Sequence, residues 1–198
     1  MQLNVKIYGI GVFIALALTA CAASSTARYS ALSGNTNDSP TTRLADARVQ
    51  LGDGRVSFIA PGDLKPLTKD QIASSKFSKA KPPDHVFTNH NQYVAITFSF
   101  MPLAADQLSE YKETSVRFLS RLDPESQLLE SEIVTINGTK WVHLEVANAQ
   151  SDVDTHYHSY TTSLDRGALV FAFVSTVGDY PNVKDAFLKS AQTIQVKH

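Results

Sequence analysis

The chain has 198 residues, of which 43% are hydrophobic and 19% charged, and its formal net charge is −1. This balance lacks the excess of Lys and Arg that a phosphate-binding surface shows, so we expect no nucleic-acid partner. The only cysteine, Cys21, leaves no intramolecular disulfide and no cysteine-based zinc cluster within the chain. The folded part must therefore be stabilised by burial alone.

The N-terminal residues have the pattern of a signal peptide. Lys6 is followed by an uncharged, apolar run at residues 7–20. As a helix this run would extend about 21 Å, which is short of the roughly 30 Å hydrocarbon core of a bilayer and favours a signal-peptide core. The run ends in Leu18-Thr19-Ala20-Cys21, which resembles the bacterial lipobox.

The lipobox resemblance implies removal of residues 1–20 and attachment of acyl chains, including palmitate, to Cys21. More than one chain would anchor the protein stably in a membrane. The residue after the cysteine is Ala22, and not the aspartate associated with retention in the inner membrane. We therefore expect the chain to be anchored in the outer membrane, facing the periplasm, more than in the inner membrane. The alternative is an ordinary secretory signal that happens to end near a cysteine.

Residues 21–46 are rich in Ser, Thr, Ala and Asn and show no apolar periodicity. This composition predicts a lipidated, flexible tether. Residues 47–198 then form the single globular domain that we expect.

The first part of this domain is predicted to contain a hairpin and a short helix. Residues 49–51 and 55–60 flank a glycine-rich turn, which indicates a β-hairpin. Thr68, followed three residues later by Gln71, is typical of a capping box, so a short helix should run to about residue 77.

A strand and a long helix are expected next. Residues 92–101 are β-branched and aromatic in alternation, as in a strand. Apolar residues near helical spacing predict an amphipathic helix over residues 103–122, which Asp123-Pro124 should end.

The last part of the chain is predicted to be mostly strand. Asn137-Gly138 is the strongest two-residue hairpin signal and joins two of these strands. A helix with Pro181 in its first turn follows the last long strand. The expected strands cover residues 128–136, 139–147, 155–164, 168–176 and 193–196, of which 168–176 is apolar enough to be central. The order predicts an α+β domain, an antiparallel β-sheet with helices packed on it.

Three stretches resemble the PsbP-like α/β/α sandwich and, within it, the DcrB-like bacterial lipoproteins. They are residues 56–62 (VSFIAPG), residues 136–141 (INGTKW), and the apolar strand around Phe171 with the helix and short strand that follow it. The resemblance covers about residues 48–197. It implies this fold and a non-enzymatic accessory or binding role on a larger assembly, and it supplies no catalytic residues.

The sequence carries no G-x-S-x-G elbow, H-E-x-x-H motif or P-loop. The function predicted from the sequence is a membrane-anchored periplasmic lipoprotein that acts as a non-enzymatic accessory, docking or ligand-binding module of the cell envelope. We expect an envelope protein as partner and no cofactor. The alternative is a periplasmic metal-binding protein or hydrolase that uses a histidine and glutamate patch.

Two carboxylate pairs and one tryptophan have ordinary structural explanations. Glu110 and Glu113 on the long helix, and Glu130 and Glu132 on a strand, are expected to be solvated faces. Trp141 could stack on a ligand, but for a single tryptophan on a strand we favour a place in the core or as cover on the sheet.

Four residues are candidates for a metal site. A tight turn after residue 148 would place Glu145 opposite His158 and His143 opposite Tyr160, with His156 on the same face. This register would bring the imidazoles and the carboxylate within reach of Zn²⁺ or Cu²⁺. A slip of one residue would separate them. The other interpretation, which we favour from the sequence, is a polar, half-exposed sheet face on which Glu145 pairs with a histidine and no metal binds.

Overall fold

The computed structural model describes residues 48–78, 81–122, 126–148, 154–165 and 167–197. The predicted signal peptide and tether, Cys21 included, lie outside these residues, as do Asp123 and Pro124. The elements in chain order are β1 (Arg48–Leu51), β2 (Val56–Ile59), β3 (Lys65–Pro66), α1 (Lys69–Ser74), η2 (Lys76–Ser78), β4 (His85–Thr88), β5 (Ala95–Met101), η3 (Ala105–Gln107), α2 (Leu108–Leu122), β6 (Ser126–Ile136), β7 (Thr139–Asn148), β8 (Thr155–Leu164), β9 (Gly167–Thr176), α3 (Tyr180–Gln192) and β10 (Gln195–Val196).

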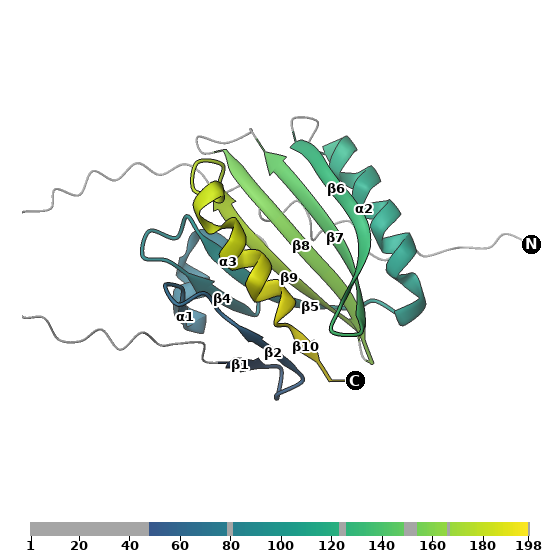
Figure 1. Ribbon diagram of the computed structural model, residues 1–198, viewed down its shortest axis with the longest axis horizontal. Helices are drawn as coiled ribbons and strands as arrows, with labels where there is room; N and C mark the ends of the chain where they lie inside the picture. Colours follow the sequence, from purple (N-terminus) through teal and green to yellow (C-terminus); the bar gives the residue numbers. More distant parts are fainter. Residues whose placement is uncertain (1–47, 79–80, 123–125, 149–153, 166, 198) are drawn as a thin grey trace, which may run out of the picture.

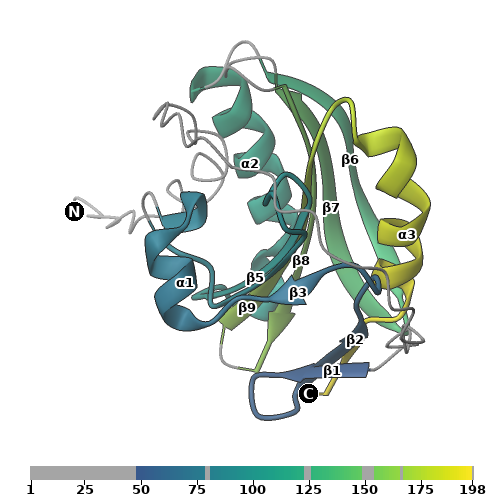
Figure 2. The same cartoon turned by 90° about the vertical axis from the view of Figure 1, so that its left-hand side faces the viewer.

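A seven-stranded antiparallel sheet forms the middle layer, in the order β3-β4-β5-β9-β8-β7-β6. The apolar strand β9 is central, as its sequence predicts. Figure 1 shows α3 crossing one face of this sheet, and Figure 2 shows α1 and α2 on the opposite side. The fold is therefore α+β with an α/β/α layering, which confirms the predicted fold class.

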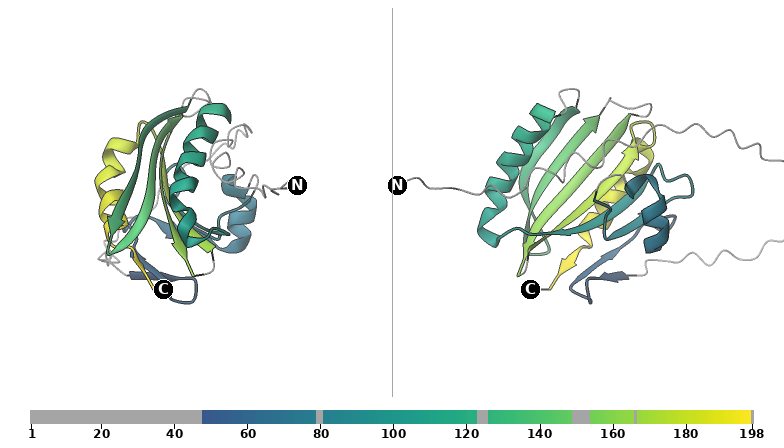
Figure 3. Two further views of the ribbon diagram at one scale, coloured as in Figure 1. Left: turned by 90° about the vertical axis from the view of Figure 1, so that its right-hand side faces the viewer. Right: turned by 180° about the vertical axis from the view of Figure 1, so that it is seen from behind.

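A second, three-stranded sheet has the order β1-β2-β10. Its β1–β2 hairpin is the one predicted around the glycine-rich turn, with Leu51 opposite Val56. Strand β10 pairs with the other edge of β2, so that the first and last strands both flank β2. Figure 3 shows this small sheet at one end of the large one, beside the C-terminal end of α3.

The main core lies between the large sheet, α3 and the small sheet. Phe58 of the small sheet contacts Phe98 and Phe171 of the large sheet, with ring centroids 4.7 and 5.9 Å apart. On α3, Phe187 packs on Phe173 at 4.6 Å. Trp141 is completely buried in the same cluster, as expected for a core residue, which confirms that prediction.

The opposite face of the sheet packs against α2. Tyr111 of α2 is buried with Val142 and Leu144 of β7 in a smaller cluster. Glu110 and Glu113 are exposed, as predicted for the outer side of this helix. The two faces of β7 thus bury different residues against α2 and α3, since side chains alternate along a strand.

The structure differs from the predicted elements at short segments. Strands β3 and β4 were not expected from the sequence, and a 3₁₀ turn, η3, precedes α2. The capping box is confirmed, because Thr68 accepts from the backbone N–H of Gln71 and the Gln71 side chain accepts from that of Thr68. In the described part of the chain, no helix combines the length and apolar character needed to span a bilayer.

Candidate functional site

The β6–β7 hairpin positions the first carboxylates of the site. Asn137 and Gly138 have φ values of 49° and 81°, which is the pair of left-handed residues that a tight two-residue hairpin turn requires. The turn fixes a register in which Glu132 lies opposite His143 and Glu130 lies opposite Glu145. All four side chains therefore belong to the face of the sheet that α3 covers.

The β7–β8 register is the one predicted from the sequence. Glu145 lies opposite His158 and His143 lies opposite Tyr160, with His156 on the same face. The register prediction is confirmed, although the connecting residues 149–153 lie outside the described residues.

The start of α3 brings a fifth side chain to these residues. Gly178 and Asp179 connect β9 to α3, and the Thr176 hydroxyl hydrogen-bonds to the Asp179 carboxylate (2.8 Å) and accepts from its backbone N–H (2.9 Å). This short connection places Tyr180, the first residue of α3, over the neighbouring strand β8. We call His143, Glu145, His156, His158 and Tyr180 the histidine cluster.

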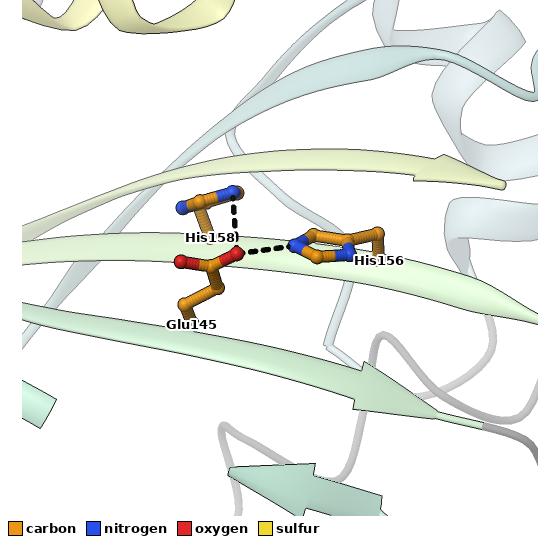
Figure 4. A group of neighbouring side chains, drawn as sticks. All are labelled: Glu145, His156 and His158. Atoms are coloured by element: carbon orange, nitrogen blue, oxygen red, sulfur yellow. Dashed lines mark hydrogen bonds and ion pairs between the residues drawn. The ribbon is translucent and has the colours of Figure 1, made fainter. Parts of the chain in front are cut away.

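Glu145 contacts both His156 and His158, as Figure 4 shows. Its Oε1 lies 2.7 Å from Nε2 of His156 and 3.6 Å from Nε2 of His158. The Tyr180 hydroxyl donates to the same oxygen at 3.3 Å and lies 2.8 Å from Nε2 of His158. One carboxylate oxygen thus has three polar neighbours from β8 and α3.

His143 extends the cluster toward β6. Its Nε2 lies 3.1 Å from Nδ1 of His158. Its Nδ1 faces two carboxylates, Glu130 at 3.6 Å and Glu132 at 3.8 Å. These two glutamates are exposed, as predicted, but they also contact a buried histidine, which their description as a solvated face did not anticipate.

The prediction of a half-exposed face is wrong for the histidines. His143, His156 and His158 retain only 5%, 7% and 4% of their exposure. The physical reason is aromatic cover: the Tyr180 ring stacks on His156 with centroids 3.5 Å apart, and Tyr160 stacks on His143 at 4.5 Å. The pairing of Glu145 with a histidine, which belonged to the same prediction, is present.

Burial controls the protonation of the cluster. It lowers the pKa of His143, and the charges of Glu130 and Glu132 only partly offset this. Burial also lowers the pKa of His158, to about 4. At Glu145, burial raises the pKa, but the hydrogen bond from His156 and the nearby His158 outweigh it, and the pKa is lowered. Near neutral pH the cluster therefore holds a carboxylate beside neutral His143 and His158.

Two sets of side chains have the spacing of metal ligands. Glu145, His156 and His158 each offer one ligand atom within 4.8 Å of the others, and so do Glu130, Glu132 and His143. The first set is largely buried, whereas two of the three side chains in the second are exposed. All four metal candidates from the sequence are thus brought together, three in the first set and His143 in the second.

Tyr180 is a member of the site that the sequence analysis missed, and Glu130 and Glu132 are neighbours that it assigned to solvent. The β6–β7 register, which Asn137-Gly138 determines, could have placed Glu132 opposite His143. No sequence signal could have found Tyr180, because its position depends on how α3 packs on the sheet.

Solved structures with the same fold come from bacteria. Cyanobacterial PsbP (CyanoP) from Synechocystis sp. PCC 6803 is 15% identical, with a TM-score of 0.58 over 83% of this chain and 100% of that one. LpqN of Mycobacterium tuberculosis, a protein involved in cell envelope biogenesis, is 12% identical, with a TM-score of 0.50 over 81% of this chain and 100% of its own. No family model matches the sequence, and no curated protein matches it either. The fold is therefore PsbP-like, whereas the narrower likeness to DcrB-like lipoproteins stays a prediction.

Proposed function

We propose that this chain is a lipoprotein of the bacterial cell envelope, processed and acylated at Cys21. The observation that carries the proposal is the position of the only cysteine, directly after an apolar run and two small residues. A run of this length matches a signal-peptide core better than a membrane span. The envelope role named for LpqN, which shares the fold, is consistent with this location.

The folded domain, on this proposal, is a non-enzymatic accessory module that docks on an envelope protein or binds a ligand. Support comes from the lack of a G-x-S-x-G, H-E-x-x-H or P-loop motif in the sequence and from the fold, which is shared with CyanoP and LpqN. The tether at residues 21–46 would hold the domain away from the membrane, on the periplasmic side of the outer membrane.

The experiment is fractionation of cells that express the full chain with labelled palmitate. The unchanged chain should carry label and sediment with membranes. Cys21→Ser should carry no label, and it should accumulate as precursor or appear in the soluble fraction after the signal is removed. If mature Cys21→Ser still fractionates with membranes, the lipoprotein proposal is wrong.

A second variant tests the choice of membrane. Ala22→Asp introduces the residue associated with inner-membrane retention and leaves Cys21 intact, so labelling should be unchanged while the protein moves from the outer to the inner membrane in an enteric host. Cross-linking in intact membranes, with the chain still anchored, would then identify the protein on which the domain docks. A chain that cross-links to no envelope protein, and binds no ligand, would contradict the accessory role.

A further inference from the structure

Glu145, His156 and His158 have the composition of a first-row transition-metal site. Two imidazoles and one carboxylate form a common ligand set for Zn²⁺ when a fourth position stays open for water. His156 and His158 are two residues apart on β8, so their side chains project from the same face of the sheet. The carboxylate of Glu145 projects from the paired strand β7 on that face. All three ligand atoms come from the interior of a rigid sheet, which holds them more precisely than a loop would.

The distances between these ligand atoms suit a single small cation. Zn²⁺ with bonds of about 2.0 Å in tetrahedral geometry needs ligand atoms roughly 3.3 Å apart. The Glu145 oxygen lies 2.7 Å from His156 Nε2 and 3.6 Å from His158 Nε2, and all three atoms lie within 4.8 Å of one another. Opening the shorter contact by about half an ångström would admit the ion.

The hydrogen bonds around these residues leave one ring nitrogen of His143 without a hydrogen. Three contacts within hydrogen-bond distance form a chain: His143 Nε2 to His158 Nδ1, His158 Nε2 to the Tyr180 hydroxyl, and that hydroxyl to Glu145 Oε1. Each contact needs one hydrogen between its two heavy atoms, and two neutral imidazoles with one phenol supply three. Nδ1 of His143 then has no hydrogen and turns its lone pair toward Glu130 at 3.6 Å and Glu132 at 3.8 Å, which is unfavourable in a buried site.

A metal ion on Nε2 of His158 removes this unfavourable contact. Nδ1–H of His158 then donates to Nε2 of His143, Nδ1–H of His143 donates to the β6 glutamates, and the Tyr180 hydroxyl donates to Glu145. Three hydrogens then serve three contacts. This arrangement is also the usual environment of a metal-bound histidine, whose second ring nitrogen donates to a carboxylate or another acceptor.

Ser175 is a polar neighbour of the site on the next strand. Among the described residues its buried hydroxyl has no hydrogen-bond partner, and the residue lies directly opposite His156 on β9 and therefore on the same face of the sheet. When Nε2 of His156 binds a metal, the ring hydrogen moves to Nδ1 and needs an acceptor. The Ser175 hydroxyl does not hydrogen-bond to His156 in the structure, so it would have to turn to become that acceptor.

We propose that Glu145, His156 and His158 bind a divalent transition-metal ion, with Zn²⁺ as the probe, and that His143 positions His158 through its second ring nitrogen. The Glu145 side chain retains 16% of its exposure, which gives the ion a way in from solvent. The site does not depend on membrane anchoring, so its failure and the failure of the lipoprotein proposal would be seen in different experiments.

The test is calorimetric titration of Zn²⁺ into the full chain in detergent, after treatment with a chelator. The chain carries Cys21→Ser so that no thiol competes. One Zn²⁺ should bind with micromolar or tighter affinity. His158→Ala should weaken binding at least 100-fold, and His90→Ala, which changes an exposed histidine outside the cluster, should leave the affinity unchanged. Heat no larger than a millimolar background would overturn the proposal, as would equal binding by His158→Ala.

Two further variants keep the test independent of folding defects. Glu145→Gln has nearly the same shape and can still hydrogen-bond to His156, but it lacks the charge, so it should fold and bind Zn²⁺ far more weakly. His143→Ala should lower the affinity by about 10–100-fold, as the loss of a supporting partner does elsewhere. Unchanged affinity in Glu145→Gln would overturn the ligand assignment, and unchanged affinity in His143→Ala would overturn the positioning role.

The ring hydrogens provide a readout that a merely structural role would not change. Nitrogen-detected NMR of the histidine side chains should show His158 with hydrogen on Nδ1 alone once Zn²⁺ is bound, and a broadened or shifted Nε2. If His143 or His158 is doubly protonated at neutral pH and Zn²⁺ does not bind, a proton supplies the missing hydrogen and the metal proposal is wrong.

Discussion

The side-chain amide of Asn137 donates to the backbone carbonyl of Ile194 at 2.7 Å, although the two residues are far apart in the sequence. The same amide also donates to the carbonyl of Gln192 at 2.8 Å. The β6–β7 hairpin turn is thereby tied to the end of α3 and the start of β10. Asn137 thus has two roles, because its backbone also takes the left-handed conformation that the turn needs, with φ of 49°.

Asn137→Ala should lower the free energy of unfolding by about 2 kcal/mol, because it removes both hydrogen bonds and strains a left-handed position. Asn137→Gly removes the same hydrogen bonds but tolerates the backbone conformation, so its loss should be smaller. Urea unfolding of the two variants measures both contributions. Equal losses in both would show that the backbone conformation contributes little.

Much of the site was accessible to sequence reasoning because one described tight turn and the predicted β7–β8 pairing determine its register. Asn137-Gly138 fixes the β6–β7 pairing, and the register assumed for β7 and β8 correctly placed Glu145 opposite His158. The sequence could not indicate burial of the histidines, because that depends on Tyr180 and hence on the packing of α3.

The elements missed in the fold have a different cause. Strand β3 has two residues and β4 has four, too few to show a period of two. Both are defined by pairing within the sheet, β3 with β4 and β4 with β5. The long strands and both long helices carry enough repeats for their patterns to be unambiguous, and their predicted types are confirmed.

Gly167→Ala should be among the most destabilising single-methyl additions in the domain. Gly167 has φ of +116°, and a Cβ there would lie 2.5 Å from the carbonyl oxygen of Met101. We expect a loss of about 3 kcal/mol in the free energy of unfolding, since both the backbone and its neighbour on β5 must shift. Gly178→Ala is the matched control, because its Cβ would meet nothing closer than 3.9 Å and its effect should stay within about 0.5 kcal/mol. A Gly167→Ala protein as stable as this control would contradict the crowding.

The metal-free domain should lose stability as the pH falls below about 6.5. The pKa of His158 is about 4 in the folded state, below its ordinary value of 6.5, so between these values the unfolded chain binds more protons. The free energy of unfolding must therefore decrease with decreasing pH in this window. The lowered pKa of His143 also makes the free energy of unfolding decrease as the pH falls. The lowered pKa of Glu145 decreases the free energy of unfolding further at lower pH. The charged and titratable groups that face His158 are Glu145, His143, His156, Lys184 and Tyr180, and His143 in turn faces Glu130 and Glu132.

Urea unfolding in the presence of a chelator, at pH 7.5 and at pH 5, measures this loss. His158→Gln carries no titrating group and should lose less stability between the two conditions than the unchanged chain. His90→Ala should lose as much as the unchanged chain does. A pH dependence identical in all three proteins would show that His158 is not responsible.

The order of the strands also determines when the site forms as the chain folds. Strands β6 to β9 follow one another as three consecutive hairpin pairings. The pairings of β5 with β9 and of β2 with β10 instead join strands that are distant in the sequence. Closing short loops costs less entropy, so the β6–β9 meander should be structured in the folding transition state before those distant pairings exist. His143, Glu145, His156 and His158 all lie on β7 and β8. The polar cluster should then be assembled early, and Tyr180 should be added when α3 docks, so substitutions at Tyr180 should change the unfolding rate more than the folding rate.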